Sequence, residues 1–220
     1  CERNCKPILF GMNHCDPEQP TLVLTEGQID SLSCAEAGIK NAVSVPNGAK
    51  GFTWIPYCWD FLSRFANLVI FGDFEHEAIS LLPEMQKRFH GTVKHIREDD
   101  YKDCKDANEI LQKYGPEYLQ KCVENAVPVQ EVVFVMDRFG YCKLLDKSTY
   151  ERNQETVDTE QVYVKRCLNT DKICLFTASG TLHQIKALDI PSGKLRDKGV
   201  PIENLSKYDG REDRICLLTC

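Results

Sequence analysis

Short apolar runs that favour β-strands alternate with helical patterns in the first part of the chain, and this alternation restricts the fold more than any other feature. The strand-like runs are 21–25, 41–45, 67–72 and 92–96, and the helical patterns are about 28–38, 57–65, 77–89 and 106–126. Strands separated by helices are typically parallel, and continuous apolar runs indicate a sheet covered on both faces. We therefore predict an α/β domain, a parallel sheet flanked by helices, over residues 1–127.

The pattern changes at "ENAVPVQE" (124–131), which is the best candidate for a domain boundary. Beyond it the chain reads as short strands and polar turns with little helix. Two of the turns, at Asp137–Gly140 and Ala178–Gly180, separate apolar runs and predict hairpins.

The strands of this second half recur at a regular spacing. Aligning the first strands of successive units gives Val132, Ile173 and Ile215. A period near 40 residues with four-strand content is typical of propeller blades. We predict that residues 128–220 form an all-β domain of propeller-like blades, with about two blades present.

Charge and composition limit the class of protein. Residues 1–128 carry a net charge of −6 and residues 129–220 a net charge of 0, which argues against a uniformly basic nucleic-acid clamp but allows a local basic face. No apolar run approaches about 18 residues, so we expect no membrane span. Most of the twelve cysteines stand singly in apolar runs, as buried thiols do in the reducing cytoplasm. The chain does not begin with Met, and we expect it to be a piece of a longer protein.

Carboxylates follow two of the predicted strands. Glu26 comes directly after the first strand, and Asp73 and Glu75 come after "LVIFG"; Asp30 lies about one helical turn beyond Glu26. The carboxyl ends of parallel strands are where ligands bind in open sheets. Oxygen ligands of this kind suit Mg²⁺, with Mn²⁺ as an alternative, and such an ion can activate a nucleophile and stabilise a phosphoryl group.

A simpler explanation is open for two of these acids. Glu26 and Asp30 could merely stabilise the start of a helix, an interaction worth about 0.3–1 kcal/mol. The second acidic group, "GDFE" at a neighbouring strand end, favours the metal site.

Four segments of the first half resemble the Toprim domain, in the form found in primases and phage-type primase-helicases. They are "TEGQIDSLSCAEAG", "NAVSVPNGAKG", "VIFGDFE" and "KDANEILQKYG", and the resemblance covers about residues 7–125. The motif E-G-x-x-D is matched by Glu26, Gly27 and Asp30. The usual D-x-D is here Asp73-Phe74-Glu75, with Glu as the second acid.

This resemblance implies roles for the acids. Glu26, Asp73 and Glu75 would hold Mg²⁺, and Asp30 would support the catalytic site. Asp106 matches a late acidic motif and is a further candidate metal ligand, although Asn108 stands where many relatives carry Asp.

Three lysines are candidates for binding a nucleotide. Lys50 ends "PNGAK", where glycine would let backbone N–H groups approach a phosphate. Lys102 and Lys105 lie beside the late acidic motif and could contact a phosphate. An ordinary turn and a solvated charged run are the alternatives.

The second half resembles the C-terminal domain of gyrase A and topoisomerase IV A proteins over about residues 131–220. The resemblance depends on "VVFVMDRFGYCKLLD", "KICLFTASGTLHQIKALDIP" and "KLRDKGVPIENL". It implies duplex DNA held on a basic rim through phosphate contacts. The candidate DNA-binding residues are Arg138, Lys143, Lys186, Lys194, Arg196 and Lys198. The alternative is a solvated strand edge, because lysines also protect edges from aggregation.

The leading hypothesis is a Mg²⁺-dependent nucleic-acid enzyme of DNA replication. It would be a primase-type nucleotidyltransferase that makes RNA primers, with an attached DNA-binding β module. DNA and nucleoside triphosphates are the expected partners, and a replicative helicase is a candidate partner. The alternatives are a DNA-binding fragment of a topoisomerase IV A-like system and a Toprim nuclease.

Overall fold

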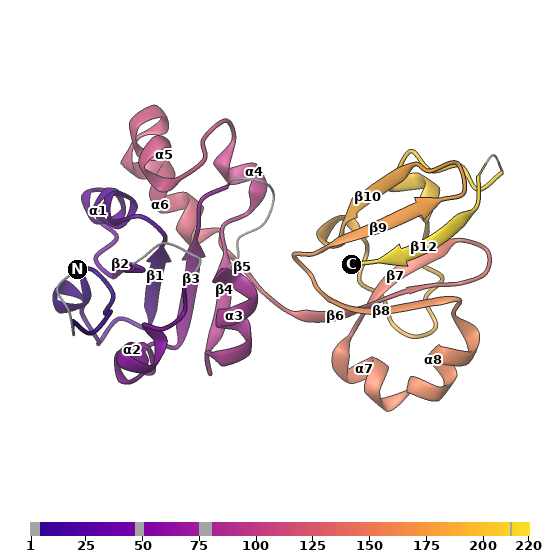
Figure 1. Cartoon of the computed structure of the whole chain (residues 1–220), viewed down its shortest axis with the longest axis horizontal. Coiled ribbons are helices and arrows are strands. Elements are labelled where there is room, and N and C mark those ends of the chain that lie inside the picture. The colour runs from indigo at the N-terminus through magenta and orange to yellow at the C-terminus, as the bar shows by residue number, and fades with distance from the viewer. Residues whose placement is uncertain (1–4, 47–50, 75–80, 212) are drawn as a thin grey trace. The chain divides into compact units, whose positions relative to one another are not determined.

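The chain folds into two compact units, Cys1–Val129 and Gln130–Cys220. The structure is a computed structural model, which describes residues 5–46, 51–74, 81–211 and 213–220 (Figure 1). Each unit has its own hydrophobic core.

The first unit contains a five-stranded sheet in the order β2-β1-β3-β4-β5. Its strands are β1 (Thr21–Thr25), β2 (Ala42–Ser44), β3 (Asn67–Phe71), β4 (Thr92–His95) and β5 (Val127–Pro128). The first four strands are parallel, and β5 adds a short antiparallel edge. The predicted parallel sheet is therefore confirmed.

Helices connect these strands. They are α1 (Gln28–Glu36), α2 (Ile55–Leu62), α3 (Leu81–Arg88), α4 (Glu98–Tyr101), α5 (Ala107–Tyr114) and α6 (Pro116–Glu124), with a short 3₁₀ turn, η1, at Met12–His14. The last long helical pattern divides into α5 and α6 because Gly115 takes a φ of 82° and Pro116 starts a new helix.

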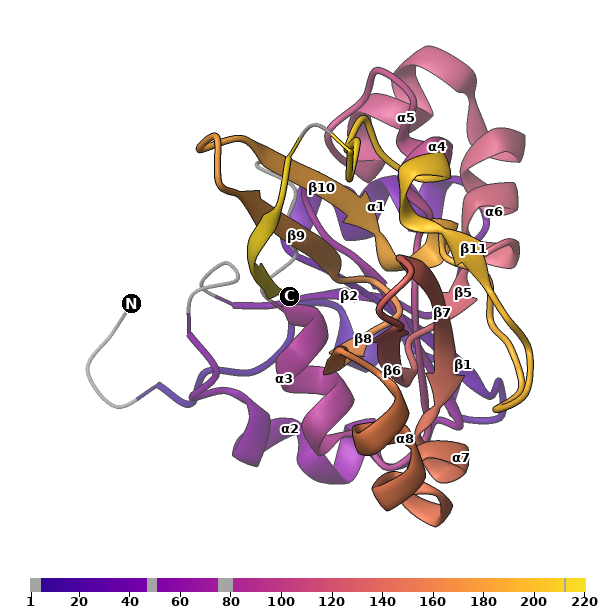
Figure 2. The same ribbon diagram turned by 90° about the vertical axis from the view of Figure 1, so that its right-hand side faces the viewer.

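The strand order creates a switch point between β1 and β3. The chain leaves β1 towards β2 on one side, and then returns past β1 to β3 on the other. Since such crossovers are right-handed, α1 packs on one face with α5 and α6, and α2 and α3 lie on the opposite face (Figures 1 and 2). Ligand crevices in open α/β sheets form at the carboxyl ends of the strands at such a point.

The second unit consists of two antiparallel sheets and two helices. One sheet has the order β11-β7-β6-β8 and the other the order β10-β9-β12. The strands are β6 (Glu131–Met136), β7 (Tyr141–Asp146), β8 (Tyr163–Leu168), β9 (Lys172–Thr177), β10 (Leu182–Lys186), β11 (Val200–Pro201) and β12 (Ile215–Thr219). The helices are α7 (Lys147–Arg152) and α8 (Gln154–Glu160), and the 3₁₀ turns are η2 (Ala187–Asp189) and η3 (Ile202–Asn204).

The layers of this unit follow from the alternation along β6. Val132, Phe134 and Met136 contribute to a core shared with the three-stranded sheet. Val133 and Val135 pack on the other face against α7 and α8. The four-stranded sheet is thus the middle layer, between the three-stranded sheet and the helices (Figures 1 and 2).

The prediction of an all-β second domain is wrong, because α7 and α8 cover one of its sheets. Asp146 starts α7 by accepting a hydrogen bond from Thr149 N–H at 2.9 Å. Tyr150 of α7 and Val157 of α8 have buried side chains. This burial of apolar residues explains why a polar segment forms helices beside strands.

Separate propeller-like blades are not confirmed. The strand that was expected to begin a third blade, β12, instead pairs with β9 and completes the same sheet as β10. The two predicted hairpins are present, as β6–β7 and β9–β10.

Two further observations concern the described parts of both units. No described helix has the length and apolar character needed to cross a membrane. The eleven cysteines that the structure describes are free thiols, and Cys34 and Cys142 are buried as small apolar side chains.

Candidate functional site

The tips of β1 and β3 lie side by side in the first unit. Their parallel register pairs Thr25 with Phe71, so Glu26 and Asp73 leave the sheet from adjacent strands. Both side chains are half-buried. The buried Thr25 hydroxyl is within hydrogen-bonding distance of the carbonyls of Gly27 (2.9 Å) and Val43 (3.2 Å), which fixes the turn after Glu26.

Asp30 joins this turn to α5. Its carboxylate is 7% exposed and accepts a hydrogen bond from Asn108 N–H at 3.0 Å. The residue that caps α1 is Gly27, which has no side chain to do so. Asp30 therefore satisfies the first turn of a different helix, α5, and does not act as the N-cap of its own.

The carboxylate of Asp30 packs directly on Gly27. A Cβ atom built at Gly27 would lie 2.4 Å from Asp30 Oδ2. The glycine of E-G-x-x-D is thus required by close contact with the aspartate of the same motif, and not by a left-handed backbone.

Electrostatic effects place several acids in one region. Burial raises the pKa of Asp30 to about 6; the hydrogen bond from Asn108 opposes this rise, and the charges of Asp106 and Asp73 add to it. Burial also raises the pKa of Tyr101, with further increases from Asp73 and Glu26. Glu26 follows β1, Asp73 follows β3, Asp30 lies in α1 and Asp106 caps α5, so the acids that influence Asp30 and Tyr101 come from four parts of the unit.

Tyr101 is a site residue that sequence reasoning missed. It is 1% exposed, and its hydroxyl donates a hydrogen bond to Gly72 O at 2.8 Å. Its ring stacks on Phe74 with centroids 5.1 Å apart and meets Phe71 edge-on at 5.5 Å. The only sequence signal was an aromatic residue inside the charged run "EDDYKD".

The turn that carries Asp73 is held on both sides. Tyr101 binds the carbonyl of Gly72 before it, and Phe74 N–H after it donates to Lys105 O at 2.6 Å. These contacts restrict the backbone on each side of the carboxylate.

Asp106 has a structural contact of its own. It is the N-cap of α5, and its Oδ1 accepts a hydrogen bond from Glu109 N–H at 2.8 Å. Its other oxygen lies 3.8 Å from Lys105 Nζ. One oxygen of Asp106 is therefore committed to the helix end.

Two of the predicted site residues, Glu75 and Lys50, lie outside the described residues. Within the described part of the chain, no group of three or more His, Cys, Asp or Glu side chains is arranged to hold a metal ion. Glu26, Asp73 and Asp106 thus do not form a ligand set by themselves, and the expected set includes Glu75.

Lys102 has a contact that the sequence did not suggest. Its Nζ lies 3.9 Å from the ring centroid of Tyr114 and 3.8 Å from that of Tyr118. Its backbone has a φ of 53°, which is rare for a side chain of this size. Lys102 thus joins α5 and α6 through cation–π contacts. Lys105 lies closer to a candidate site acid, with its Nζ 3.8 Å from Asp106 Oδ2.

The prediction that Lys143 binds DNA from the surface is wrong. Lys143 is 5% exposed, and its ammonium group donates to the backbone carbonyls of Lys194, Leu195 and Asp197. The other candidates in this unit are more accessible. Arg138, Lys194, Arg196 and Lys198 are exposed, and Lys186 is half-buried.

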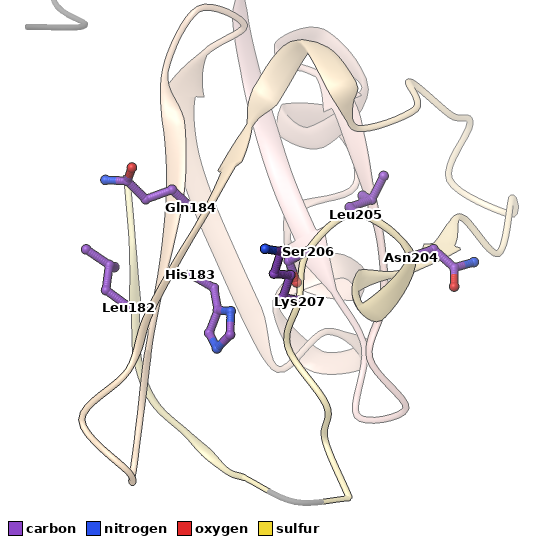
Figure 3. Close-up of a pocket in the computed structure, with 7 residues that line it drawn as sticks. All are labelled: Leu182, His183, Gln184, Asn204, Leu205, Ser206 and Lys207. Atoms are coloured by element: carbon purple, nitrogen blue, oxygen red, sulfur yellow. The ribbon is translucent and has the colours of Figure 1, made fainter.

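A groove of about 530 Å³ lies beside β10 in the second unit (Figure 3). It is lined by Leu182, His183, Gln184, Asn204, Leu205, Ser206 and Lys207. The ring of His183 meets Tyr208 edge-on at 5.8 Å. None of these residues carries a motif that the sequence would mark as functional.

Gly27→Ala is expected to destabilise the first unit by about 1–3 kcal/mol, the usual range for overpacking. The new methyl group would collide with Asp30 Oδ2. Denaturant unfolding followed by tryptophan fluorescence measures this, because both tryptophans, Trp54 and Trp59, lie in the first unit. Gly51→Ala is the matched control, since nothing lies within 4 Å of its Cβ position, and equal stability of the two variants would contradict the prediction.

Asp30 is expected to make the stability of the first unit depend on pH. Because its folded pKa of about 6 exceeds the ordinary value of 3.8, the folded state keeps the proton while the unfolded state releases it. Its contribution to the free energy of unfolding therefore falls as pH rises through this interval. Asp30→Asn should gain stability relative to the wild type at pH 7 but not at pH 3, measured by tryptophan fluorescence in EDTA. If the free energies of unfolding of Asp30→Asn and the wild type changed equally with pH, Asp30 would not be the source of the pH dependence.

Comparison with known proteins gives partial matches. No protein-family model matches the chain. The chain is 32% identical over 146 residues to a primase homolog protein of Arabidopsis thaliana, covering 58% of this chain and 43% of that protein. It is 29% identical over 148 residues to the chloroplastic/mitochondrial Twinkle homolog protein of the same plant, covering 58% and 20%. The chain thus spans less than half the length of these relatives.

A weaker match is to the DNA gyrase A protein of Ureaplasma parvum, at 23% identity over 136 residues, 52% of this chain and 16% of that protein. Among solved structures, the Aquifex aeolicus primase (zinc-binding and RNA polymerase domains) superposes with a TM-score of 0.44 at 16% identity, covering 69% of this chain and 34% of that chain. The sequence matches to the two plant proteins support a primase-type domain in this chain.

Proposed function

We propose that the first unit is a Toprim-type, Mg²⁺-dependent nucleotidyltransferase domain that makes RNA primers in DNA replication. The observation that carries this proposal is the position of Glu26 and Asp73 on adjacent strand tips at the switch point of a parallel sheet. The similarity to the primase homolog supports this reaction class.

The donor set agrees with a hard divalent cation. The candidate ligands offer only carboxylate oxygens, which Mg²⁺ and Mn²⁺ prefer. Burial raises the pKa of Asp30, and the charges of Asp106 and Asp73 raise it further, which agrees with several acids lying close to one another in this region. Glu26, Asp73 and Glu75 would hold the ion, with Asp106 beside them. When bound, the ion would stabilise the negative charge that develops on the transferred phosphoryl group.

The remaining residues of the site would orient the reactants. Asp30 holds the turn after Glu26 against α5, and Tyr101 holds the turn that carries Asp73. Lys105 Nζ lies near Asp106 and would contact the triphosphate of the incoming nucleotide, and Lys50 is a second candidate for this contact. Nucleoside triphosphates and template DNA are the proposed substrates.

The second unit would hold DNA for this reaction. Four of the predicted cations, Arg138, Lys194, Arg196 and Lys198, have exposed side chains. The weak similarity to the gyrase A protein agrees with a DNA-holding role. A replicative helicase is a further proposed partner, as the resemblance of the first unit to primase-helicases implies.

A primer-synthesis assay tests the proposal. The full chain is incubated with single-stranded DNA, the four ribonucleoside triphosphates and Mg²⁺ or Mn²⁺, and short RNA products are expected only when metal and template are both present. Cleavage of the DNA without nucleotides would instead identify a nuclease. A third outcome is salt-sensitive binding to duplex DNA that EDTA does not affect, with neither synthesis nor cleavage. This outcome would overturn the enzymatic proposal and indicate a DNA-binding fragment.

A further inference from the structure

The ammonium group of Lys143 is the centre of a small backbone cage. β7 places Cys142 and Leu144 towards the shared core, and Lys143 points the other way. Its Nζ donates to Lys194 O at 3.0 Å, to Leu195 O at 2.8 Å and to Asp197 O. An ammonium group has three N–H donors, so all of them are used on one loop.

Burial of this charge is costly without such partners. Burial lowers the pKa of Lys143, while the negative charges of Asp197, Glu160 and Asp137 raise it. The three carbonyls and three acids together compensate a cation that is 5% exposed. The loop conformation and the buried charge therefore depend on each other.

The same loop is attached to β7 at both ends. Before the cage, Leu144 N–H donates to Pro191 O at 3.0 Å and Gly193 N–H donates to Leu144 O at 2.9 Å. After the cage, Val200 pairs with Cys142. Gly199 has a φ of 78°, and a Cβ there would lie 2.3 Å from Cys142 O, so the chain passes β7 in close contact.

The outer side of this loop is cationic. Lys194, Arg196 and Lys198 have exposed side chains within five consecutive residues. Asp197, the acid between them, accepts a hydrogen bond from Lys194 N–H at 2.7 Å. Lys198 Nζ lies 4.0 Å from the ring centroid of Tyr141 on β7. The cage thus presents three cations on one constrained segment.

We propose that Lys143 is a positioning residue that fixes the 194–198 loop as a basic surface for the phosphates of duplex DNA. This inference rests on the DNA-holding role proposed for the second unit. Each phosphate that the loop neutralises should add about 0.9 to the slope of log affinity against log salt concentration. Lys143 touches no phosphate and acts through the backbone of the loop.

The first experiment compares Lys143→Met with the wild-type full chain. Methionine keeps an unbranched side chain but removes the three donors. Trypsin is expected to cut after Lys194, Arg196 and Lys198 at least about tenfold faster in the variant, since opening of the loop makes these bonds accessible. The affinity for duplex DNA is expected to fall about tenfold. The slope of log affinity against log salt concentration is expected to become shallower by more than about 0.9, which is the contribution of one phosphate contact.

Matched variants separate positioning from contact. Lys194→Gln should reduce the salt slope by about 0.9 without changing tryptic cleavage after Arg196, because the side chain of Lys194 is exposed and its backbone contacts are kept. Lys147→Met, on the exposed start of α7, should change neither measurement, because its ion pair with Glu131 is solvent-exposed. Unchanged cleavage of the loop in Lys143→Met would overturn the positioning role.

A second measurement needs no variant and covers the case in which Lys143→Met fails to fold. Lysine acetylation of the native wild-type chain should modify Lys143 at least about tenfold more slowly than Lys194 and Lys198, since modification of a buried amine requires local opening, and duplex DNA should protect these two. Equal reactivity of all three would overturn the cage. A third outcome is slow acetylation of Lys143 with no protection of Lys194 and Lys198 by DNA. This outcome would support the cage but overturn the DNA-holding role, for example in favour of an acidic protein partner.

Discussion

Replacing Glu26 with glutamine should reduce primer synthesis by about 100-fold or more, because Glu26 is a proposed ligand of a metal ion that would contribute several kcal/mol of transition-state stabilisation. Glutamine keeps the size of the side chain but removes the negative charge beside Asp73. Synthesis of primers by the full chain measures the effect, and Mn²⁺ titration followed by electron paramagnetic resonance should show weaker binding.

The stability of Glu26→Gln should not fall in parallel. Removing one of several clustered carboxylates relieves repulsion, so the tryptophan-monitored free energy of unfolding should be unchanged or higher. Glu36→Gln, at the exposed end of α1, is the matched control and should keep full activity. Retention of wild-type synthesis by Glu26→Gln would remove Glu26 from the catalytic site.

Replacing Tyr101 with alanine should destabilise the first unit by about 3–5 kcal/mol, as for other large aromatic side chains removed from a core. The ring is 1% exposed and contacts both Phe71 and Phe74. Alanine would leave a cavity next to the turn that carries Asp73. Tryptophan-monitored denaturant unfolding measures the loss.

Tyr101→Phe separates packing from the hydrogen bond. The ring stays, but Gly72 O loses its donor, at a cost of about 1–3 kcal/mol for a buried acceptor left unsatisfied. Mn²⁺ affinity should also fall, because the backbone before Asp73 is released. Tyr114→Phe is the control, since that hydroxyl bonds to exposed Asp103. Equal metal affinity in Tyr101→Phe and the wild type would exclude a role for Tyr101 in positioning Asp73.

Most of the first unit could be predicted because its signals are local. Strands such as Leu22–Leu24 within β1 are continuously apolar, and the break between α5 and α6 is marked by Gly115-Pro116. In the second unit, α7 and α8 were missed although Asp146 is a good N-cap and Tyr150 and Val157 stand seven residues apart. Those signals are weak beside the strong strand patterns that surround them.

The candidate functional residues also differ in whether their positions could be predicted from sequence. The positions of Glu26 and Asp73 at adjacent strand ends could be predicted from sequence because each comes just after an apolar strand-like run, and parallel strands end at one edge. Tyr101 and Lys143 could not, because their partners are the backbone carbonyls of Gly72 and of the 194–197 loop. Backbone acceptors are identical at every residue, so no residue pattern marks them.

Hydrophobic periodicity and chain order are local properties, and they were enough to predict the alternation of strands and helices in the first unit and the acids that follow its strand ends. The pairing of β1 with β3, the hydrogen bond between Asp30 and α5, and the burial of Lys143 under a loop could be known only from the folded chain. These contacts join residues far apart in the chain, and they depend on the packing of whole elements.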